Sequence, residues 1–241
     1  MNILVAYYSR SGHTESLGQR VQNELISRGH TVTMERIHAS KEVGKWRLAL
    51  PLWSSIPLLP LCMISARIRQ WWLACYPQPE SAIRTLAHPD VSRFDLICIG
   101  MPKWLYLPYP MARYLNTISG LQGKRVAAFA TFCGPPLKTF EIELLFEPLT
   151  HRIRNKGAQL CAQLAVSSHF HEFFFFREME YVFRLASRIV FGRSLRSFTL
   201  GSAWAESEVQ RFCDALQQDS GAKECVKENG QAARPAACME R

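Results

Sequence analysis

The chain lacks three features that would each define a class of protein. Its eight cysteines include no Cys-x-x-Cys pair and are scattered, several of them in apolar segments, which favours buried thiols in a reducing compartment. No basic leader with an apolar run and a small-residue cleavage site precedes the first apolar segment, so we expect a cytoplasmic protein. No pair of side chains stands out as a general acid and base.

Acidic residues are also scarce relative to basic ones. The chain has 20 Asp and Glu against 29 Lys and Arg, a net charge of +9. This excess predicts attraction to anionic partners, namely phosphates, nucleic acid or a negatively charged membrane surface, and charge alone does not choose among them.

The length and composition predict a single domain with a full hydrophobic core. The chain has 241 residues, of which 48% are hydrophobic. We expect one domain over residues 1–218, closed by a helix at about 205–218. Residues 219–241 are poor in bulky apolar side chains, so we expect a disordered tail there.

Five apolar segments alternate with segments of helical periodicity. We expect strands at 2–8, 31–37, 94–100, 124–131 and 158–166, and helices from Thr14 to about 28, at 110–118 and at 141–157. This alternation predicts an α/β fold: a doubly wound, five-stranded parallel sheet of order 2-1-3-4-5. In such a sheet ligands bind beyond the carboxyl ends of the strands, where we expect the loops 9–14, 100–110 and 131–136 to converge.

The loop "SRSGHT" at 9–14 lies between the first strand and its helix. A helix N-terminus offers unpaired backbone N–H groups, and three hydroxyls (Ser9, Ser11 and Thr14), a glycine (Gly12) and Arg10 surround this one. The loop is therefore suited to hold a phosphate. The alternative is that one of the hydroxyls only caps the helix.

The same loop matches the S/T-x-S/T-G-x-T phosphate loop of flavodoxin-like proteins, and "FDLICIGMPKW" resembles their third strand and aromatic flavin loop. This resemblance covers about residues 2–166 and implies FMN as the cofactor. It implies that the phosphate is held by Ser9, Arg10, Ser11, Gly12, His13 and Thr14. It implies that the flavin ring is lined on one side by Pro102, Lys103, Trp104, Leu105 and Tyr106, and on the other by Thr131, Phe132, Cys133 and Gly134.

An aromatic side chain is the natural partner of a flat flavin ring, and Trp104 or Tyr106 is the best candidate. Either could instead be an ordinary core or surface aromatic residue. The chain departs from the family in charge, because small electron-carrying flavodoxins are typically acidic. This difference argues against a generic soluble carrier.

An apolar insertion at 41–92 separates the second and third strands. Residues 48–66 carry no charge, yet prolines interrupt them and both flanking strands return to one sheet, which a single membrane crossing forbids. Basic residues and tryptophans flank the run, as in a segment lying at a bilayer interface: Lys45, Trp46, Arg47, Arg67, Arg69, Trp71 and Trp72. A lid over the core and a homodimer contact are the alternatives.

A basic, aromatic helical segment is expected at 167–200. One face would carry apolar residues, with arginines directed away from it; that face comprises Met179, Val182, Phe183, Ala186, Ile189 and Val190. Residues 41–90 and 151–200 together hold +8 of the net charge, which favours a membrane or a hydrophobic acidic partner. His169 and His171 have no third ligand pinned nearby, so we expect no metal site.

Two flavodoxin-like subgroups share parts of this layout. The basic segment resembles that of membrane-associated, quinone-dependent protoporphyrinogen dehydrogenases. The Pro- and Trp-rich insertion resembles that of longer flavodoxin-like proteins associated with dialkylresorcinol biosynthesis.

We therefore expect an FMN-binding oxidoreductase that passes electrons between NAD(P)H or a quinol and an apolar acceptor, such as a quinone, at the inner face of a membrane. The first alternative is a non-enzymatic electron carrier for a dedicated partner. A flavin-free nucleic-acid-binding protein is a weaker alternative, because the aromatic residues lie in apolar runs rather than on a polar stacking surface.

Overall fold

The computed structural model describes residues 1–42, 44, 65, 67, 68, 71, 78–103, 107–136, 143–168 and 177–231. Much of the insertion expected at 41–92 therefore lies outside the described residues. The named elements are β1 (Asn2–Tyr7), α1 (His13–Ser27), β2 (Thr31–Arg36), β3 (Leu96–Pro102), α5 (Tyr109–Thr117), β4 (Arg125–Phe132), α6 (Glu143–Asn155), β5 (Gln159–Ser167), α7 (Arg177–Phe191), the 3₁₀ helix η3 (Leu195–Phe198) and α8 (Ala203–Gln231).

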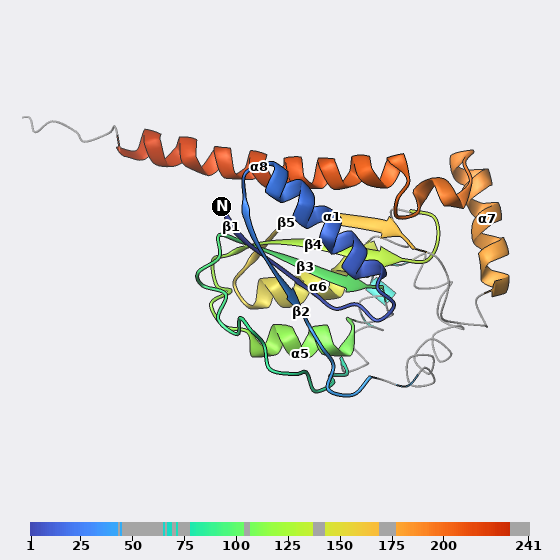
Figure 1. Ribbon diagram of the computed structural model, residues 1–241, viewed down its shortest axis with the longest axis horizontal. Helices are drawn as coiled ribbons and strands as arrows, with labels where there is room; N and C mark the ends of the chain where they lie inside the picture. The colour runs from blue at the N-terminus through green and yellow to red at the C-terminus, as the bar shows by residue number, and fades with distance from the viewer. Residues whose placement is uncertain are drawn as a thin grey trace, which may run out of the picture.

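The five strands form one parallel sheet of order β2-β1-β3-β4-β5 (Figure 1). The predicted fold class and strand order are confirmed, and no strand end differs from its expected position by more than two residues. Each of the three inner strands, β1, β3 and β4, is buried over nearly its whole length. This burial explains why their sequences show continuous apolar runs rather than alternation.

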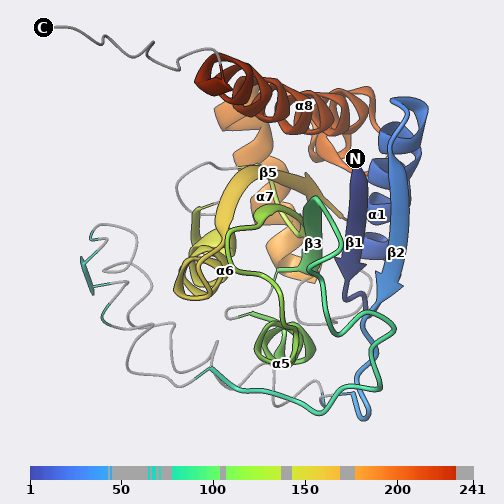
Figure 2. The same cartoon turned by 90° about the vertical axis from the view of Figure 1, so that its left-hand side faces the viewer.

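Helices cover both faces of the sheet (Figure 2). On one face α5 and α6 pack against residues such as Ile97 and Val126. On the other face α1 and α8 pack against residues such as Val5 and Phe129. The sheet is therefore the middle layer of three, as in other doubly wound α/β proteins.

Gly100 shows why one position of the central strand must lack a side chain. A Cβ built on it would lie 2.2 Å from the Phe129 ring and 2.8 Å from the Cβ of Tyr7. The Phe129 ring and the Tyr7 side chain lie closer to the backbone here than any residue with a Cβ would allow. Any larger residue at this position would displace Phe129 from the core.

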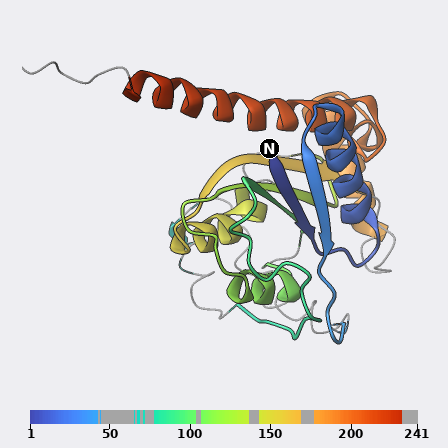
Figure 3. The same ribbon diagram turned by 60° about the vertical axis from the view of Figure 1, so that its left-hand side comes forward.

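The last helix is longer than the sequence predicts. We expected it at about 205–218, whereas α8 runs from Ala203 to Gln231 and lies beside α1 (Figure 3). The disorder expected for residues 219–241 stays a prediction. Within the described residues, no helix is both long and apolar enough to cross a bilayer.

Candidate functional site

The phosphate loop forms a tight turn ahead of α1. Gly12 has a φ of 86° and is the N-cap residue, a left-handed conformation that glycine adopts at little cost. Its N–H donates to the Ser9 Oγ at 3.1 Å. Among the described residues no side chain caps α1, so the alternative that a hydroxyl merely caps the helix is not supported.

The hydroxyls of the loop differ in exposure. Ser9 and Thr14 are buried, at 5% and 1% exposed, whereas Ser11 is exposed and Arg10 and His13 are half-buried. A Cβ built on Gly12 would meet no atom within 4 Å, so space is open beside the loop. An anion could therefore approach the backbone at this point without displacing a side chain.

A buried hydrogen bond joins the phosphate loop to β4. The hydroxyls of Thr14 and Thr131, 117 residues apart in the chain, lie 2.8 Å from each other, and Thr131 is only 3% exposed. In the low dielectric of the interior such a bond is strong and costly to break. It fixes the start of α1 against the end of β4.

The loop after β3 joins the same place. Pro102 pairs in register with Thr131, and the Lys103 N–H donates to the carbonyl of Thr131 at 2.7 Å. The described parts of the three predicted loops therefore meet at the carboxyl edge of the sheet. Three of the residues predicted to line the ring lie outside the described residues: Trp104, Leu105 and Tyr106.

The loop after β4 contributes mainly backbone. The Phe132 side chain packs in the core at 1% exposed, so only its backbone can face a ligand. Cys133 is half-buried, and Gly134 has a φ of 133°. This loop is held from β5, because the Ser167 Oγ donates to the carbonyl of Gly134 at 2.8 Å and the Ser168 Oγ to that of Phe132 at 3.2 Å.

An acidic residue near the phosphate loop is neutralised by its partners. Glu15, in the first turn of α1, forms an ion pair with Arg36 at 2.9 Å and accepts a hydrogen bond from the Tyr7 hydroxyl at 3.3 Å. Burial and the Glu15 carboxylate both raise the pKa of Tyr7, which keeps the phenol protonated as the donor. Glu15 is thus tied to the end of β2.

The sequence does not indicate two of the contacts that position the site. Thr14 and Thr131 were predicted as ligand contacts, but their mutual bond was not foreseen. Gln78 was not predicted at all: its side chain accepts from the Leu107 N–H at 3.1 Å and donates to the Leu107 carbonyl at 2.9 Å. These two hydrogen bonds tie the insertion to the loop that follows β3. No sequence motif indicates them.

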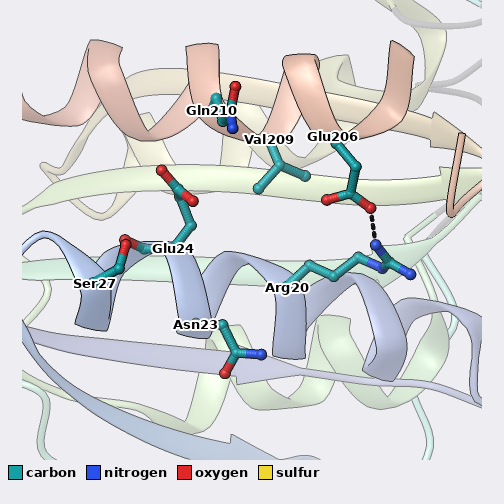
Figure 4. A pocket seen from close by; sticks show the side chains of 7 residues that line it. All are labelled: Arg20, Asn23, Glu24, Ser27, Glu206, Val209 and Gln210. Carbon is teal, nitrogen blue, oxygen red and sulfur yellow. Dashed lines mark hydrogen bonds and ion pairs between the residues drawn. The ribbon is translucent and has the colours of Figure 1, made fainter. Parts of the chain in front are cut away.

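A groove between α1 and α8 lies away from these loops. It is lined by Arg20, Asn23, Glu24, Ser27, Glu206, Val209 and Gln210, and an ion pair joins Arg20 to Glu206 across it (Figure 4). None of the predicted site residues lines it. We interpret the groove as the polar margin of the α1–α8 contact.

Metal binding finds no support in the described part of the chain, which holds no cluster of three His, Cys, Asp or Glu side chains. His169 and His171 lie outside the described residues. The described carboxyl-edge residues are instead rich in backbone donors, hydroxyls and the cationic side chains of Arg10 and Lys103. Such a donor set fits an anion rather than a metal ion.

No protein-family model matches the sequence, and no curated protein is significantly similar to it. Among solved structures, the chain is similar to flavodoxin 2 from Bacillus cereus, with 16% identity over 91% of this chain and 99% of that one and a TM-score of 0.48. It is similar to a Streptococcus pneumonia TIGR4 flavodoxin, with 10% identity over 91% and 99% and a TM-score of 0.46. It is also similar to a Lactobacillus acidophilus NCFM flavoprotein in complex with FMN, with 16% identity over 68% and 92% and a TM-score of 0.43.

These likenesses are distant, and the two subgroup resemblances stay predictions. The topology of the chain is decisive by itself, because it is read directly from the strand pairing. A five-stranded parallel sheet of order 2-1-3-4-5 between two helical layers is the flavodoxin-like fold, and this chain adopts it.

Proposed function

We propose that this protein binds FMN at the carboxyl edge of the sheet and uses it for electron transfer. The observation that carries the proposal is the turn at the start of α1, where Gly12 is in a left-handed conformation and the Thr14 hydroxyl is hydrogen-bonded to that of Thr131. A strand–loop–helix turn of this kind binds a phosphate through backbone N–H groups and the positive end of the helix dipole.

The described residues fit the parts of FMN. The loop 9–14 would hold the phosphate, with Ser11 exposed and able to donate its hydroxyl. Pro102 and Lys103 on one side and Cys133 and Gly134 on the other would flank the ring, because these positions lie on the two loops that leave β3 and β4 together. Trp104 or Tyr106 would stack on it.

When bound, FMN supplies the redox chemistry, the transfer of one or two electrons. The chain's own residues bind and orient it. The Thr14–Thr131 bond sets the spacing between the phosphate loop and β4. Gln78 holds the end of the loop that would exclude water from one side of the ring.

We further propose an electron donor such as NAD(P)H or a quinol, and an apolar acceptor such as a quinone at the inner face of a membrane. The surplus of basic residues supports an anionic surface near the acceptor. Turnover of NAD(P)H with a quinone and no added protein would support an enzyme. Flavin reduction without such turnover would indicate a carrier for a dedicated partner.

The proposal is tested by the visible absorption spectrum of the purified protein, with and without added FMN, and by the same spectrum of Ser11→Asp. A carboxylate at position 11 repels the phosphate, so the oxidised-flavin bands should weaken and the FMN Kd should rise by about tenfold or more. Because Ser11 is exposed, the variant should fold normally.

The matched control is Ser27→Asp, the same substitution in the last residue of α1, where the serine is also exposed. Its FMN affinity should equal that of the parent protein. If neither parent nor control binds FMN, the loop holds another anion or none, and the redox function is wrong.

A further inference from the structure

Helix α7 exposes a stripe of large apolar side chains. Tyr181, Leu185 and Ile189 are 72%, 60% and 73% exposed, and Val190 is 58% exposed. Residues four apart lie on one face of a helix, so the first three form a continuous stripe. Of the six large apolar side chains that are exposed in the described part of the chain, four lie on α7.

Arginines accompany this stripe. Arg184 and Arg188 lie on α7 and are exposed, as are Arg193 and Arg196 just beyond it. The sequence has no acidic residue from 181 to 200. The two acidic residues of α7, Glu178 and Glu180, come before the stripe, in the first turn of the helix.

The opposite side of α7 is anchored to the domain. Ser187 is fully buried, and its hydroxyl donates to the carbonyl of Arg193 at 2.9 Å. Phe191 packs edge-on against Phe198 at 5.2 Å between ring centroids, and Phe198 against Trp204 at 5.2 Å. The stripe is therefore the outer face of a helix whose inner face already packs on the domain.

The helix also lies beside the candidate flavin site. A Cβ built on Gly134 would lie 3.4 Å from the Phe183 ring, so α7 contacts the loop after β4. Figure 1 shows α7 beyond the carboxyl end of the sheet, the end at which the three loops meet. Whatever binds the outer face of α7 is brought close to this site.

We propose that the outer face of α7 binds the surface of an anionic phospholipid bilayer. Such a surface accepts exposed apolar side chains into its headgroup region and attracts the arginines beside them. A symmetric contact with a second copy is disfavoured, because it would bring the arginines of both copies together. The proposal that α7 binds lipid rests only on the exposed residues of this helix. The further idea that lipid binding brings the protein to an apolar acceptor rests on the proposed function.

The test is cosedimentation of the full chain with vesicles of phosphatidylcholine and with vesicles containing about a third phosphatidylglycerol. We expect binding to the anionic vesicles at least tenfold tighter than to the neutral ones, and weakened by salt. Ile189→Ser should weaken binding to the anionic vesicles by about tenfold, because it removes apolar area that the bilayer would bury. Arg188→Gln should reduce the preference for anionic lipid while leaving binding to neutral vesicles unchanged.

The matched control is Ile26→Ser, which changes another exposed isoleucine, 50% exposed, near the far end of α1. Vesicle binding should be unchanged in this variant. Equal binding by Ile189→Ser and the parent would overturn the proposal. The proposal would also be overturned if the parent protein bound no vesicles and formed a dimer that Ile189→Ser dissociated. Sedimentation does not depend on flavin, so its failure is distinguishable from a failure to bind FMN.

Discussion

Helices α1 and α7 have the same length, 15 residues, and the same apolar spacing, but opposite surroundings. In α1, Leu17, Val21 and Leu25 follow one another at intervals of four and are fully buried against the sheet. In α7, Tyr181, Leu185 and Ile189 have the same interval and are mostly exposed. Apolar spacing therefore identifies a helix face but does not tell what covers it.

The difference lies in where each helix falls in the topology. α1 crosses from β1 to β2 and must lie on the sheet, so its stripe is covered as soon as the sheet forms. α7 follows the last strand and is not required to return, so only one side of it packs on the domain. The buried stripe contributes to stability, and we assign the exposed one to binding.

The largest expected effect is on the free energy of unfolding, when the same substitution, Leu→Ala, is made in each of the two helices. Leu25→Ala should lower the free energy of unfolding by about 2–5 kcal/mol, because it leaves a cavity in a closely packed core. Leu185→Ala should change it by less than about 0.5 kcal/mol, because the side chain is already in solvent. Urea denaturation of both variants measures this, and similar losses in the two would show that α7 is covered in solution.

A smaller effect is expected at the bond between α1 and β4. Thr131→Val keeps the shape of the side chain but leaves the buried Thr14 hydroxyl without its partner, which should cost about 1–3 kcal/mol. If this bond also sets the spacing of the FMN site, the Kd for FMN should rise in the same variant.

The control for this change is Thr117→Val. Its hydroxyl donates to the carbonyl of Arg113 in its own helix, at 2.9 Å and in an exposed position. Denaturation and FMN titration of the control should both resemble the parent. A Thr131→Val protein as stable as the control would mean that the buried bond contributes nothing.

A substitution at Tyr114 tests how much a buried polar group without a hydrogen-bond partner destabilises the fold. Its hydroxyl is buried and finds no hydrogen bond within the described residues, and burial and the Glu35 carboxylate raise the pKa of Tyr114. Tyr114→Phe removes this hydroxyl, so the free energy of unfolding should rise by about 1 kcal/mol. A loss of stability, seen by thermal denaturation, would indicate a partner such as a buried water.

The smallest expected effect is on the pH dependence of stability, and it arises near the carboxyl end of α1. Burial, the N-terminal amine and Arg28 lower the pKa of His30 below its usual 6.5. Between the two pKa values the unfolded chain binds more protons, so stability is highest above pH 6.5 and falls as the pH drops through that window. His30→Gln should remove this part of the slope of Tm against pH between 7.5 and 5.5, and an unchanged slope would contradict the assignment.

The sheet could be predicted because its physical signals are local. Buried parallel strands such as β3 and β4 appear as uninterrupted apolar runs, and the winding rules then order them. The same rules predict that the loops at Gly12, Lys103 and Cys133 meet, because each follows a strand of the same sheet edge.

What could not be predicted depends on contacts across the fold. The Thr14–Thr131 bond joins two ordinary threonines whose separation is set by strand register. The periodicity of α7 placed Phe183 and Ile189 on one apolar face, yet Phe183 is half-buried and Ile189 is exposed, because the covered side depends on where the helix docks. Such facts follow from packing and not from sequence spacing.

The central claim is that the loop 9–14 holds the phosphate of FMN, and comparison of FMN with riboflavin tests it most directly. The two share the flavin ring and differ in the phosphate, so titration of the protein by flavin fluorescence isolates the contribution of the loop. We predict that FMN binds at least a hundredfold more tightly than riboflavin, as expected when several backbone donors and the helix start contact an anion. Equal affinities for the two flavins would contradict the account.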